Sequence, residues 1–569
     1  MFWRRKINHR ELKKLIAVAK GEAPADLLLA HAKIINTFTA EVEPGNVAIF
    51  DGIIAGVGDY YEARQVIDLE GKFVIPGLIN GHTHIESPRR PIGRYAEAVV
   101  PHGTCAVVTD LHEIANVCGI GGIKYIMSCA RSLPLDIFLM VPSCVPATKL
   151  ETSGAQLSAD SVQAYLGKEN VLGLGEVMDF PAVLSGDREM LLKISLCKGK
   201  VIDGHAPGLK GKALEAYLAA GILSDHESTT LKEAEEKLKR GMYLMIREGS
   251  SAKNLDALLP AVSDQTYPRC LFVVDDRSCV DLFNDGDIDA VVRKAIGRGL
   301  DPVRAIQLAT INPAVYFGLH RFGAVAPGYI ANLMVIDDLA AFNIEMVFHH
   351  GQLVAKEGKP LFSVDIPKDE DLAHTVNIRP FNIEALRMAA CEKVYPIIEV
   401  IPGQIVTKKR IEEMKSEGGF IVSDVDRDIL KLVVVERHRA SGNLGLGLVK
   451  GFGLKTGAMA TSFAHDSHNI VAVGTNDEDI LMAIKGIERL EGGLVLTSGG
   501  EILDSLPLPI AGLLSTEPLE VVVNKLENLE RTTISLGCSL PSPFAVLSFL
   551  ALPVIPELRL TDLGLVEVD

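Results

Sequence analysis

The stretch VIPGLINGHTHI (residues 74–85) is the most informative part of the sequence, because an almost wholly apolar run ends abruptly in two histidines. Continuous apolar strands that alternate with helices are typical of a parallel sheet buried on both faces. Eight such units within about 240 residues match the size of a closed (β/α)8 TIM-like barrel, which gives an α/β fold class. The seven later runs are CAVVTD (105–110), IFLMVPS (137–143), VLGLGEV (171–177), VIDGHA (201–206), ILSDHE (222–227), YLMIREGS (243–250) and LFVVDD (271–276).

Strand patterns of a different kind lie on both sides of this region. Residues 26–69 carry short runs with β-branched alternation, cut by Gly, Pro and Asp turns, and residues 323–364 return to that style. Such runs are typical of antiparallel sheet. We therefore predict a small β-sandwich domain built from both flanks. Residues 1–72, with an initial helix, and residues 321–366 form this domain, and the barrel spans residues 73–320.

The last third of the chain mixes apolar strands with helices after a charged linker. Strand candidates include LKLVVVE (430–436), NIVAVGT (469–475) and GGLVLTSG (492–499), and residues 477–490 have a helical pattern. We predict a separate C-terminal α+β domain over residues 373–569. A length of 569 residues agrees with several domains, since a domain takes roughly 150 residues.

Charge and cysteine usage exclude several classes of partner. The 57 basic and 73 acidic residues give a net charge of −16, which repels phosphate backbones and anionic lipid. We therefore expect neither a nucleic-acid nor a membrane partner. The nine cysteines include no CxxC pair, and the N-terminus lacks the apolar core of a signal peptide, so we expect a cytoplasmic protein. Because barrels with accessory domains often pair, we also expect a homo-oligomer, namely a dimer.

Ionisable residues stand at the ends of most of the apolar runs. His82 and His84 are two positions apart and therefore share one face of their strand. In barrels of this kind the carboxyl ends of the strands form the active-site face, so these residues should converge there. Imidazole and carboxylate ligands together suit manganese, iron or zinc. The other four candidate ligands end later runs: Glu176, His205, His226 and Asp275.

Six ligands are more than one tetrahedral site needs. Two divalent ions bridged by Glu176 would use them all, with His82, His84 and Asp275 on one ion and the two later histidines on the other. Water bound to such an ion can reach a pKa of about 7, which supplies hydroxide at neutral pH. The ligand set therefore predicts a hydrolase.

The residues and motifs of this region resemble the amidohydrolase superfamily, and the wider sequence is similar to the adenine deaminase family. The resemblance covers nearly the whole chain and departs at Pro88 and Leu111, neither of which is a candidate ligand. The similar stretches include GHTHIESP (81–88), GLGEVMDFPAV (173–183), DGHAPGLKG (203–211), ILSDHESTT (222–230) and, near the C-terminus, GAMATSFAHDSHNIVAVGTNDEDI (457–480).

The resemblance implies hydrolysis of adenine to hypoxanthine and ammonia, in purine salvage, by attack of metal-bound hydroxide on C6. It implies two divalent ions, Mn²⁺ first, with Fe²⁺ or Zn²⁺ as alternatives. Glu176 and Asp275 are then the catalytic residues: the first passes a proton towards N1, and the second protonates the departing amine. Since successive strand residues point oppositely, only one of Asp275 and Asp276 faces the ions, and analogy with other purine deaminases favours Asp275.

Three further residues are candidates for binding the substrate. Glu86, just beyond the second histidine, would hydrogen-bond the purine edge, although it could equally face solvent. Asp276 would contact a ring nitrogen, or would cap the next turn. Arg247 would orient the substrate, or would pair with its neighbour Glu248.

Roles for several other polar residues stay open. Asp110, His112 and Glu113 end the second run and belong to the same expected mouth, although Asp110 could cap a helix. His465 and His468 could close over the site or be purely structural. The remaining histidines are expected to be surface or packing residues without metal-ligating neighbours: His9, His31, His320, His349, His350, His374 and His438.

Two other functions are compatible with these patterns. A different metal-dependent amidohydrolase, such as a deacetylase or cyclic-amide hydrolase, would use the same ligands. A catalytically inactive binding protein would be expected to have lost ligands, and all six are present.

Overall fold

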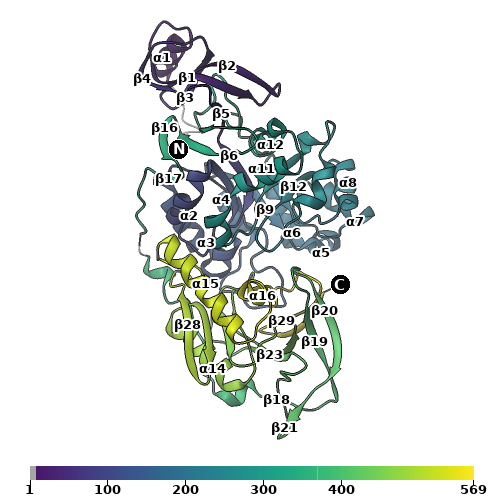
Figure 1. Cartoon of the computed structure of the whole chain (residues 1–569). Helices are drawn as coiled ribbons and strands as arrows, with labels where there is room; N and C mark the ends of the chain where they lie inside the picture. Colours follow the sequence, from purple (N-terminus) through teal and green to yellow (C-terminus); the bar gives the residue numbers. More distant parts are fainter. Residues whose placement is uncertain (1–7, 368, 569) are drawn as a thin grey trace.

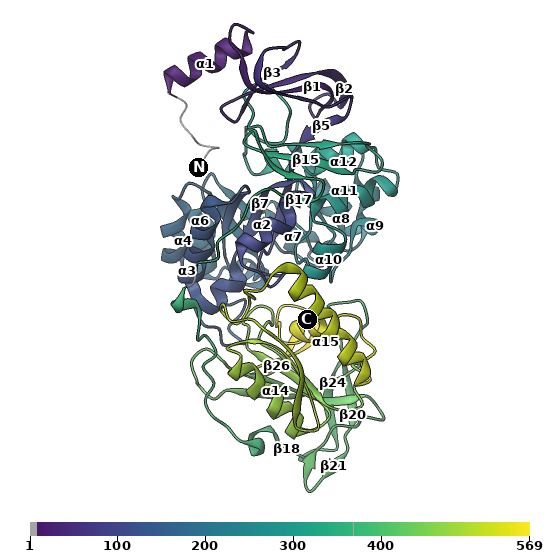
Figure 2. The ribbon, with the colours of Figure 1, turned by 60° about the vertical axis from the view of Figure 1, so that its left-hand side comes forward.

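The structure of the chain is a computed structural model that describes residues 8–367 and 369–568. The two outer limits of the predicted domains, residues 1 and 569, lie outside the described residues. Figures 1 and 2 show three parts stacked along one axis: a β-rich part at the top, a central part of strands and helices, and a C-terminal part below. None of the helices described in these ranges is long and apolar enough to cross a membrane.

Both flanks of the central part pair in a single nine-stranded sheet. They meet where β5 and β14 run antiparallel, with Val74 opposite Val335. Leu29 of the first flank and Leu333 of the second are buried in the same hydrophobic cluster. The strands are β1 (Ala25–Asn36), β2 (Glu41–Phe50), β3 (Ile53–Gly58), β4 (Ala63–Asp68) and β5 (Phe73–Pro76), then β14 (Leu333–Ile336), β15 (Ile344–His349), β16 (Gln352–Lys356) and β17 (Lys359–Pro360).

The central part is built on parallel strands in two hydrogen-bonded groups. Five strands form one group, in the order β10-β9-β8-β7-β6, and three form the other, β11-β12-β13. β6, β7 and β9 are buried at every position, which explains why their sequences are apolar without alternation. Their bounds are β6 (Leu78–Thr83), β7 (Thr104–Asp110), β8 (Asp136–Val141), β9 (Val171–Val177), β10 (Val201–Gly204), β11 (Ser224–Asp225), β12 (Tyr243–Arg247) and β13 (Cys270–Val273).

Contacts at the strand ends curl these groups towards each other. Thr83 of β6 forms a parallel bridge with Asp275, directly after β13, and the Asp275 N–H donates to the carbonyl of His82 at 3.0 Å. The result is a curled parallel sheet. Helices follow its strands along the chain, among them α2 (Ile92–Val99), α3 (His112–Cys129), α4 (Ala159–Leu166), α6 (Arg188–Leu196), α7 (Gly211–Ala219), α8 (Leu231–Lys239), α11 (Ile288–Gly297) and α12 (Pro302–Leu308).

The C-terminal part contains an eight-stranded sheet with three helices. The order of the sheet is β20-β19-β24-β23-β26-β25-β27-β28. At the start of α14 the Asn476 side chain accepts from the N–H of Asp479 and caps the helix, whose helical pattern the sequence shows over residues 477–490. The elements are β19 (Val394–Val400), β20 (Thr407–Glu413), β23 (Ile429–Val435), β24 (Leu444–Lys450), β25 (Ala458–Thr461), β26 (Ile470–Gly474), α14 (Asp477–Arg489), β27 (Gly493–Ser498), β28 (Glu501–Pro507), α15 (Leu519–Ser535), α16 (Pro543–Phe549) and a hairpin of β29 (Glu557–Thr561) and β30 (Gly564–Val568).

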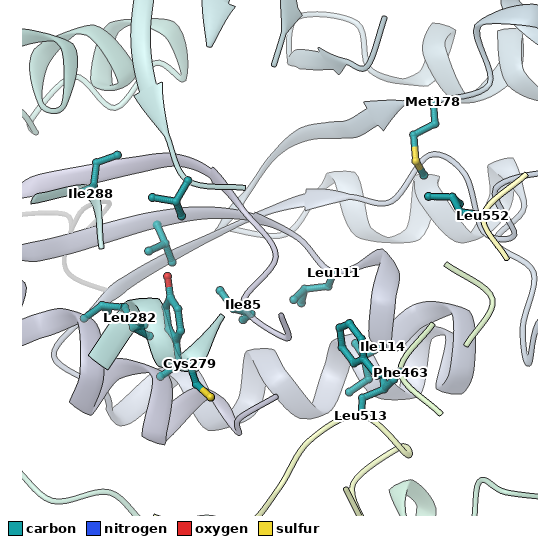
Figure 3. Packing of buried hydrophobic residues seen from close by; sticks show 14 of the residues in the cluster. Ile85, Leu111, Ile114, Met178, Cys279, Leu282, Ile288, Phe463, Leu513 and Leu552 are labelled. Carbon is teal, nitrogen blue, oxygen red and sulfur yellow. The ribbon is translucent and has the colours of Figure 1, made fainter. Parts of the chain in front are cut away.

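One hydrophobic cluster continues from the central part into the C-terminal part. Figure 3 shows Phe463 and Leu513 beside Ile114 of α3, and Leu552 beside Met178. A backbone hydrogen bond from Ser515 N–H to Arg89 O, 2.9 Å long, crosses the same boundary. The C-terminal part is therefore packed against the loops that follow the parallel strands.

Candidate active site

A cavity of about 600 Å³ lies between the strand ends of the central part and the C-terminal part. Its lining includes Glu176, Arg247 and Asp275 from the central part, and Gln404 and Phe549 from the C-terminal part. A neighbouring cavity of about 400 Å³ shares Asp276 and His465 with it. The polar residues predicted at the strand ends thus face a space large enough for a small heterocycle.

The two histidines of the first strand both enter this site. His82 is the fifth residue of β6 and His84 follows its end, and their rings lie 5.0 Å apart in an edge-to-face arrangement. His84 Nδ1 lies 3.1 Å from the carbonyl oxygen of Asp110, which leaves Nε2 directed at the carboxylates. The i and i+2 spacing therefore places both imidazoles as predicted.

Glu176 lies between the histidines of the site. Its Oε1 is 3.3 Å from His84 Nε2, while its Oε2 is 2.9 Å from His205 Nδ1 and 3.3 Å from His226 Nε2. The two oxygens of one carboxylate therefore face two different groups of imidazoles. Burial opposes the charge of Glu176, but the surrounding histidines, His226 first, hold its pKa well below the usual range.

A close backbone approach positions Glu176. The Asp110 carboxylate accepts a hydrogen bond of 3.0 Å from the Glu176 N–H. A Cβ at Gly175 would lie 1.8 Å from Asp110 Oδ2, so only glycine fits directly before Glu176. The sequence left the role of Asp110 open, and the structure places it as a support for the centre of the site.

Asp275 reaches the site through a left-handed backbone turn, with φ +58°. Its Oδ1 lies 3.0 Å from His84 Nε2 and 3.4 Å from His82 Nε2, and its Oδ2 accepts from Arg247 Nη1 at 2.7 Å. Burial alone would favour the neutral acid, but Arg247 and the histidines hold the pKa of Asp275 well below its usual range. Asp276 instead accepts from the Ser87 hydroxyl and lines both cavities.

The donor atoms of the site could hold a divalent metal ion. At least four groups of its residues each bring three ligand atoms within 4.8 Å of one another. Among the described residues, His82 Nε2 is buried without a hydrogen-bond partner, an arrangement that is costly unless another group satisfies it. The groups include His82, His84 and Glu176; Glu176, His205 and His226; His82, His226 and Asp275; and His84, Asp275 and Asp276.

His112 is a site residue that the sequence pattern indicated only weakly. Its ring lies 4.5 Å from that of His84, and its Nδ1 is 3.5 Å from Glu176 Oε1. In the sequence, only its position just after the second strand, which resembles that of the proposed ligands, pointed to a place in the site. The strand pattern could not show that its ring turns inward.

The C-terminal histidines contact one carboxylate of the central part. Glu113 lies 2.5 Å from His465 Nδ1 and pairs on its other oxygen with His468. Burial opposes the charge of His465, yet Glu113 and nearby aspartates raise its pKa to about 9. His465 lines the cavity, whereas His468 is wholly buried. The segment AHDSH (residues 464–468), which contains both histidines, therefore forms part of the boundary of the site.

The candidate substrate-binding residues are placed differently from one another. Arg247 donates to Glu227 and Asp275, whereas Glu248 pairs with Lys294. Arg247 lines the 600 Å³ cavity, and Glu86 is not among the described residues that line it. Glu86 is buried and accepts from the N–H of Ile114 at 3.2 Å, and burial raises its pKa to about 7.

Comparison with known families places these features in one class of protein. The amidohydrolase family model matches residues 73–354, which include all six candidate ligands. The chain is therefore an amidohydrolase, a family that uses divalent metal ions. A second model, described as the adenine deaminase C-terminal domain, matches residues 404–569.

Full-length relatives narrow the family further. The chain is 59% identical to an adenine deaminase of Dehalococcoides mccartyi, with 98% of each chain covered. It is 50% identical to adenine deaminase 2 of Carboxydothermus hydrogenoformans, again over 98% of each chain. It is 45% identical to an adenine deaminase of Halalkalibacterium halodurans, over 98% of this chain and 97% of that one. The chain belongs to the adenine deaminase family, as its motifs predicted.

Proposed function

We propose that this chain catalyses the hydrolytic deamination of adenine to hypoxanthine and ammonia, a step of purine salvage. One observation supports this most directly. The cavity that contains Glu176 and Asp275 has a second wall from the region matched to the adenine deaminase C-terminal domain. A substrate between these walls would meet both the hydrolytic residues and the part of the chain that distinguishes this family.

The architecture that we propose for this function has three domains. The two groups of parallel strands would form one (β/α)8 barrel over residues 73–320, an arrangement supported by the bridge between Thr83 and Asp275. The nine-stranded sheet would fold into a small β-sandwich from residues 1–72 and 321–366, supported by the core that its two flanks share. Residues 373–569 would form the α+β domain that covers the barrel mouth.

We propose that the site holds two divalent ions, Mn²⁺ in the first place, with Fe²⁺ or Zn²⁺ as alternatives. The two oxygens of Glu176 face opposite groups of imidazoles, which suits a bridging ligand. His82, His84 and Asp275 would hold one ion, and His205 and His226 the other. Ions in these positions would lower the pKa of a coordinated water and so supply the nucleophile.

Deamination at C6 requires two proton transfers. N1 of the ring must gain a proton, and the amino group must leave as ammonia rather than as an amide anion. Glu176 is a carboxylate at the centre of the site and would accept one proton from the attacking water and pass it to N1. Asp275, on the side of Arg247, would accept the second proton of that water and deliver it to the amino group, which leaves as ammonia when the C6–N bond breaks.

The residues around these two carboxylates would hold the reacting groups in place. Arg247 donates at 2.7 Å to Asp275 Oδ2, so it fixes that side chain while lining the cavity. Asp276 would accept from a ring nitrogen or exocyclic group of the purine. Glu86 would hydrogen-bond the purine edge if the loop after His84 moves. In its present position it accepts a hydrogen bond from the N–H of Ile114 in the first turn of α3.

An ammonia-release assay tests this function. The purified enzyme, loaded with Mn²⁺ or with Fe²⁺, is given adenine, adenosine, an acetylated amino sugar and a cyclic amide. We expect ammonia from adenine. Acetate release from the sugar or ring opening of the cyclic amide, without ammonia from adenine, would favour another amidohydrolase reaction, and inactivity with adenine under both metals would overturn the assignment.

We also propose a cytoplasmic homodimer that binds neither nucleic acid nor membrane. All nine cysteines of the chain are free thiols, which suits a reducing compartment. The net charge of −16 disfavours polyanions. Sedimentation velocity would test the dimer, and a single species of about 61 kDa would rule it out.

A further inference from the structure

A second cluster of metal-ligating side chains lies at the other end of the parallel strands. Its carboxylate, Asp136, is the first residue of β8, whereas the cavity residues of the central part, such as Glu176 and Arg247, lie at or beyond the carboxyl ends of their strands. At about 3.3 Å per residue, β8 separates its two ends by roughly 17 Å. This cluster therefore cannot share an ion with the site around Glu176.

The other two members lie at the tip of the hairpin formed by β15 and β16. His349 pairs with Gln352, which leaves His350 and Gly351 as a two-residue loop with φ values of +49° and +73°. A loop with two positive φ angles is usually built from Asn-Gly or Asp-Gly. This chain has His-Gly there, and the expectation that these histidines lack metal-ligating neighbours is wrong.

Both imidazoles are directed at the same oxygen of Asp136. The Nε2 atoms of His349 and His350 lie 3.2 and 3.0 Å from Asp136 Oδ2, and the two rings stack with centroids 3.8 Å apart. Asn332 holds the cluster from behind. Its Nδ2 donates to Asp136 Oδ2 at 2.8 Å, and its Oδ1 accepts from the His350 N–H at 2.8 Å. Supporting hydrogen bonds of this kind commonly orient metal ligands.

We propose that Asp136, His349 and His350 bind one Zn²⁺ ion. Two imidazoles and one carboxylate form a common zinc ligand set, with the fourth position left to water. The three ligand atoms lie within 4.8 Å of one another. A tetrahedron with metal–ligand bonds of about 2.0–2.1 Å has edges of about 3.3 Å, close to the two nitrogen–oxygen distances of this cluster. To bind zinc, each Nε2 must present its lone pair rather than a proton, so zinc uptake would release protons or move them to Nδ1.

The cluster is accessible to an ion from solvent. It borders a cavity of about 470 Å³, whose lining also includes Arg131 and Asn170. Asp136 belongs to the central part of the chain, and the two histidines belong to the flanking sheet. A zinc ion here would cross-link the two parts and stabilise the folded chain, because the unfolded chain cannot bring the ligands together.

A metal count on a matched pair of variants tests this site. His350→Asn removes the imidazole and keeps the turn, since asparagine tolerates positive φ. His320→Asn makes the same change at an exposed histidine outside the cluster. The proteins are stripped with chelator, loaded with ZnCl2, desalted and analysed for zinc. We expect wild type and His320→Asn to hold one more zinc per chain than His350→Asn, with kcat for adenine within about twofold in all three.

Thermal unfolding gives a second readout. Adding zinc should raise the Tm of wild type by several degrees more than that of His350→Asn. Asp136→Asn, which keeps the shape of the side chain, should lose the same equivalent of zinc and serves if His350→Asn does not fold. Equal zinc counts and equal Tm responses in wild type and the variants would overturn the proposal.

A further variant separates this site from the proposed reaction. His82→Ala should lose zinc from the cavity and lose activity, yet it should retain the equivalent held by Asp136. Combining it with His350→Asn should remove one further equivalent of zinc per chain. The count does not depend on turnover, so an inactive wild-type enzyme would affect the proposed function and leave the zinc site standing.

Discussion

The two walls of the 600 Å³ cavity differ in composition and in support. The wall from the central part consists of buried ionisable groups such as Glu176 and Asp275, held by strand ends and by each other. The wall from the C-terminal part consists of loop and helix residues that include Ile405, Phe549 and Leu552, with only a few polar groups. We expect from this difference that the residues on the parallel sheet carry out the chemistry, while the second wall shapes the site and excludes water.

The walls are nevertheless connected. Glu113 of the central part lies 2.5 Å from His465 of the C-terminal part, and both are almost fully buried. Replacing one residue of a buried charged pair is costly, because the charge of the other residue is then buried without a partner. Substitutions on the first wall should therefore abolish turnover, and those on the second should change stability or substrate binding.

The largest effect is expected at the centre of the first wall. Glu176→Gln should lower kcat at least about 1000-fold, since it removes the carboxylate that we propose as proton carrier and as shared metal ligand. Steady-state kinetics together with a metal count would measure it. Glu169→Gln, an exposed change just before β9, is the matched control and should leave kcat unchanged. Near-normal turnover in Glu176→Gln would refute its catalytic role.

The second prediction separates the neighbouring aspartates. Asp275→Asn should lower kcat at least about 1000-fold, because its carboxylate contacts two histidines of the site. Asp276→Asn should mainly raise KM for adenine, by about tenfold, the value of one hydrogen bond to a charged group. The paired kcat and KM values make the test. An equal fall of kcat in both variants would contradict the assignment of Asp275, rather than Asp276, as the metal ligand.

The third prediction concerns the connection between the walls. His465→Gln should lower the free energy of unfolding by about 3 kcal/mol at pH 6.5, because Glu113 then loses its charged partner. Folding raises the pKa of His465 from its usual 6.5 to about 9. The stability from its charge is therefore complete below pH 6.5 and is lost as the pH rises to about 9.

Urea unfolding at pH 6.5 and at pH 9.5 would measure this change. The gap between wild type and His465→Gln should narrow at the higher pH, and His320→Gln at an exposed site should show no gap at either pH. A gap that stays constant would show that the charge of His465 does not contribute.

The smallest effect is expected on the apolar part of the second wall. Phe549 lines the cavity, and its ring stacks on His465 with centroids 4.4 Å apart. Phe549→Leu should raise KM for adenine about threefold and leave kcat unchanged, because an aromatic contact contributes about 0.5–1.5 kcal/mol. Phe420→Leu, away from the cavity, is the control. A thousandfold loss of kcat in Phe549→Leu would contradict the expectation that the second wall affects substrate binding or stability and not the chemical step.

The first wall could be predicted in large part from local sequence. Apolar runs that end in His82, His84, Glu176, His205, His226 and Asp275 identified residues that the structure brings together. Family membership, predicted from the same motifs, is confirmed at 59% identity over 98% of the chain. Strand periodicity makes this possible, since a parallel sheet puts all carboxyl ends of its strands on one edge.

Other features depend on contacts between distant residues. The pairing of Asp110 with the backbone of Glu176 joins residues 66 positions apart, and that of Glu113 with His465 joins residues 352 positions apart. Asp136 and its two histidines are more than 200 positions apart. No local pattern marks such pairs, because neither partner's neighbours differ from those of ordinary surface or core residues.

The sequence by itself determined the parallel strands, the histidines and carboxylates at their ends and the family, because each is encoded in the spacing of residues along a few turns or strands. Only the tertiary structure showed that Asp275 contacts His82, His84 and Arg247 while Asp276 accepts from Ser87, what covers the cavity and which of the remaining histidines meet a carboxylate. Those outcomes depend on a left-handed turn at Asp275, on the packing of the C-terminal part against the central part and on the direction of the hairpin formed by β15 and β16. They follow from the packing of the whole chain, where burial outweighs local preference.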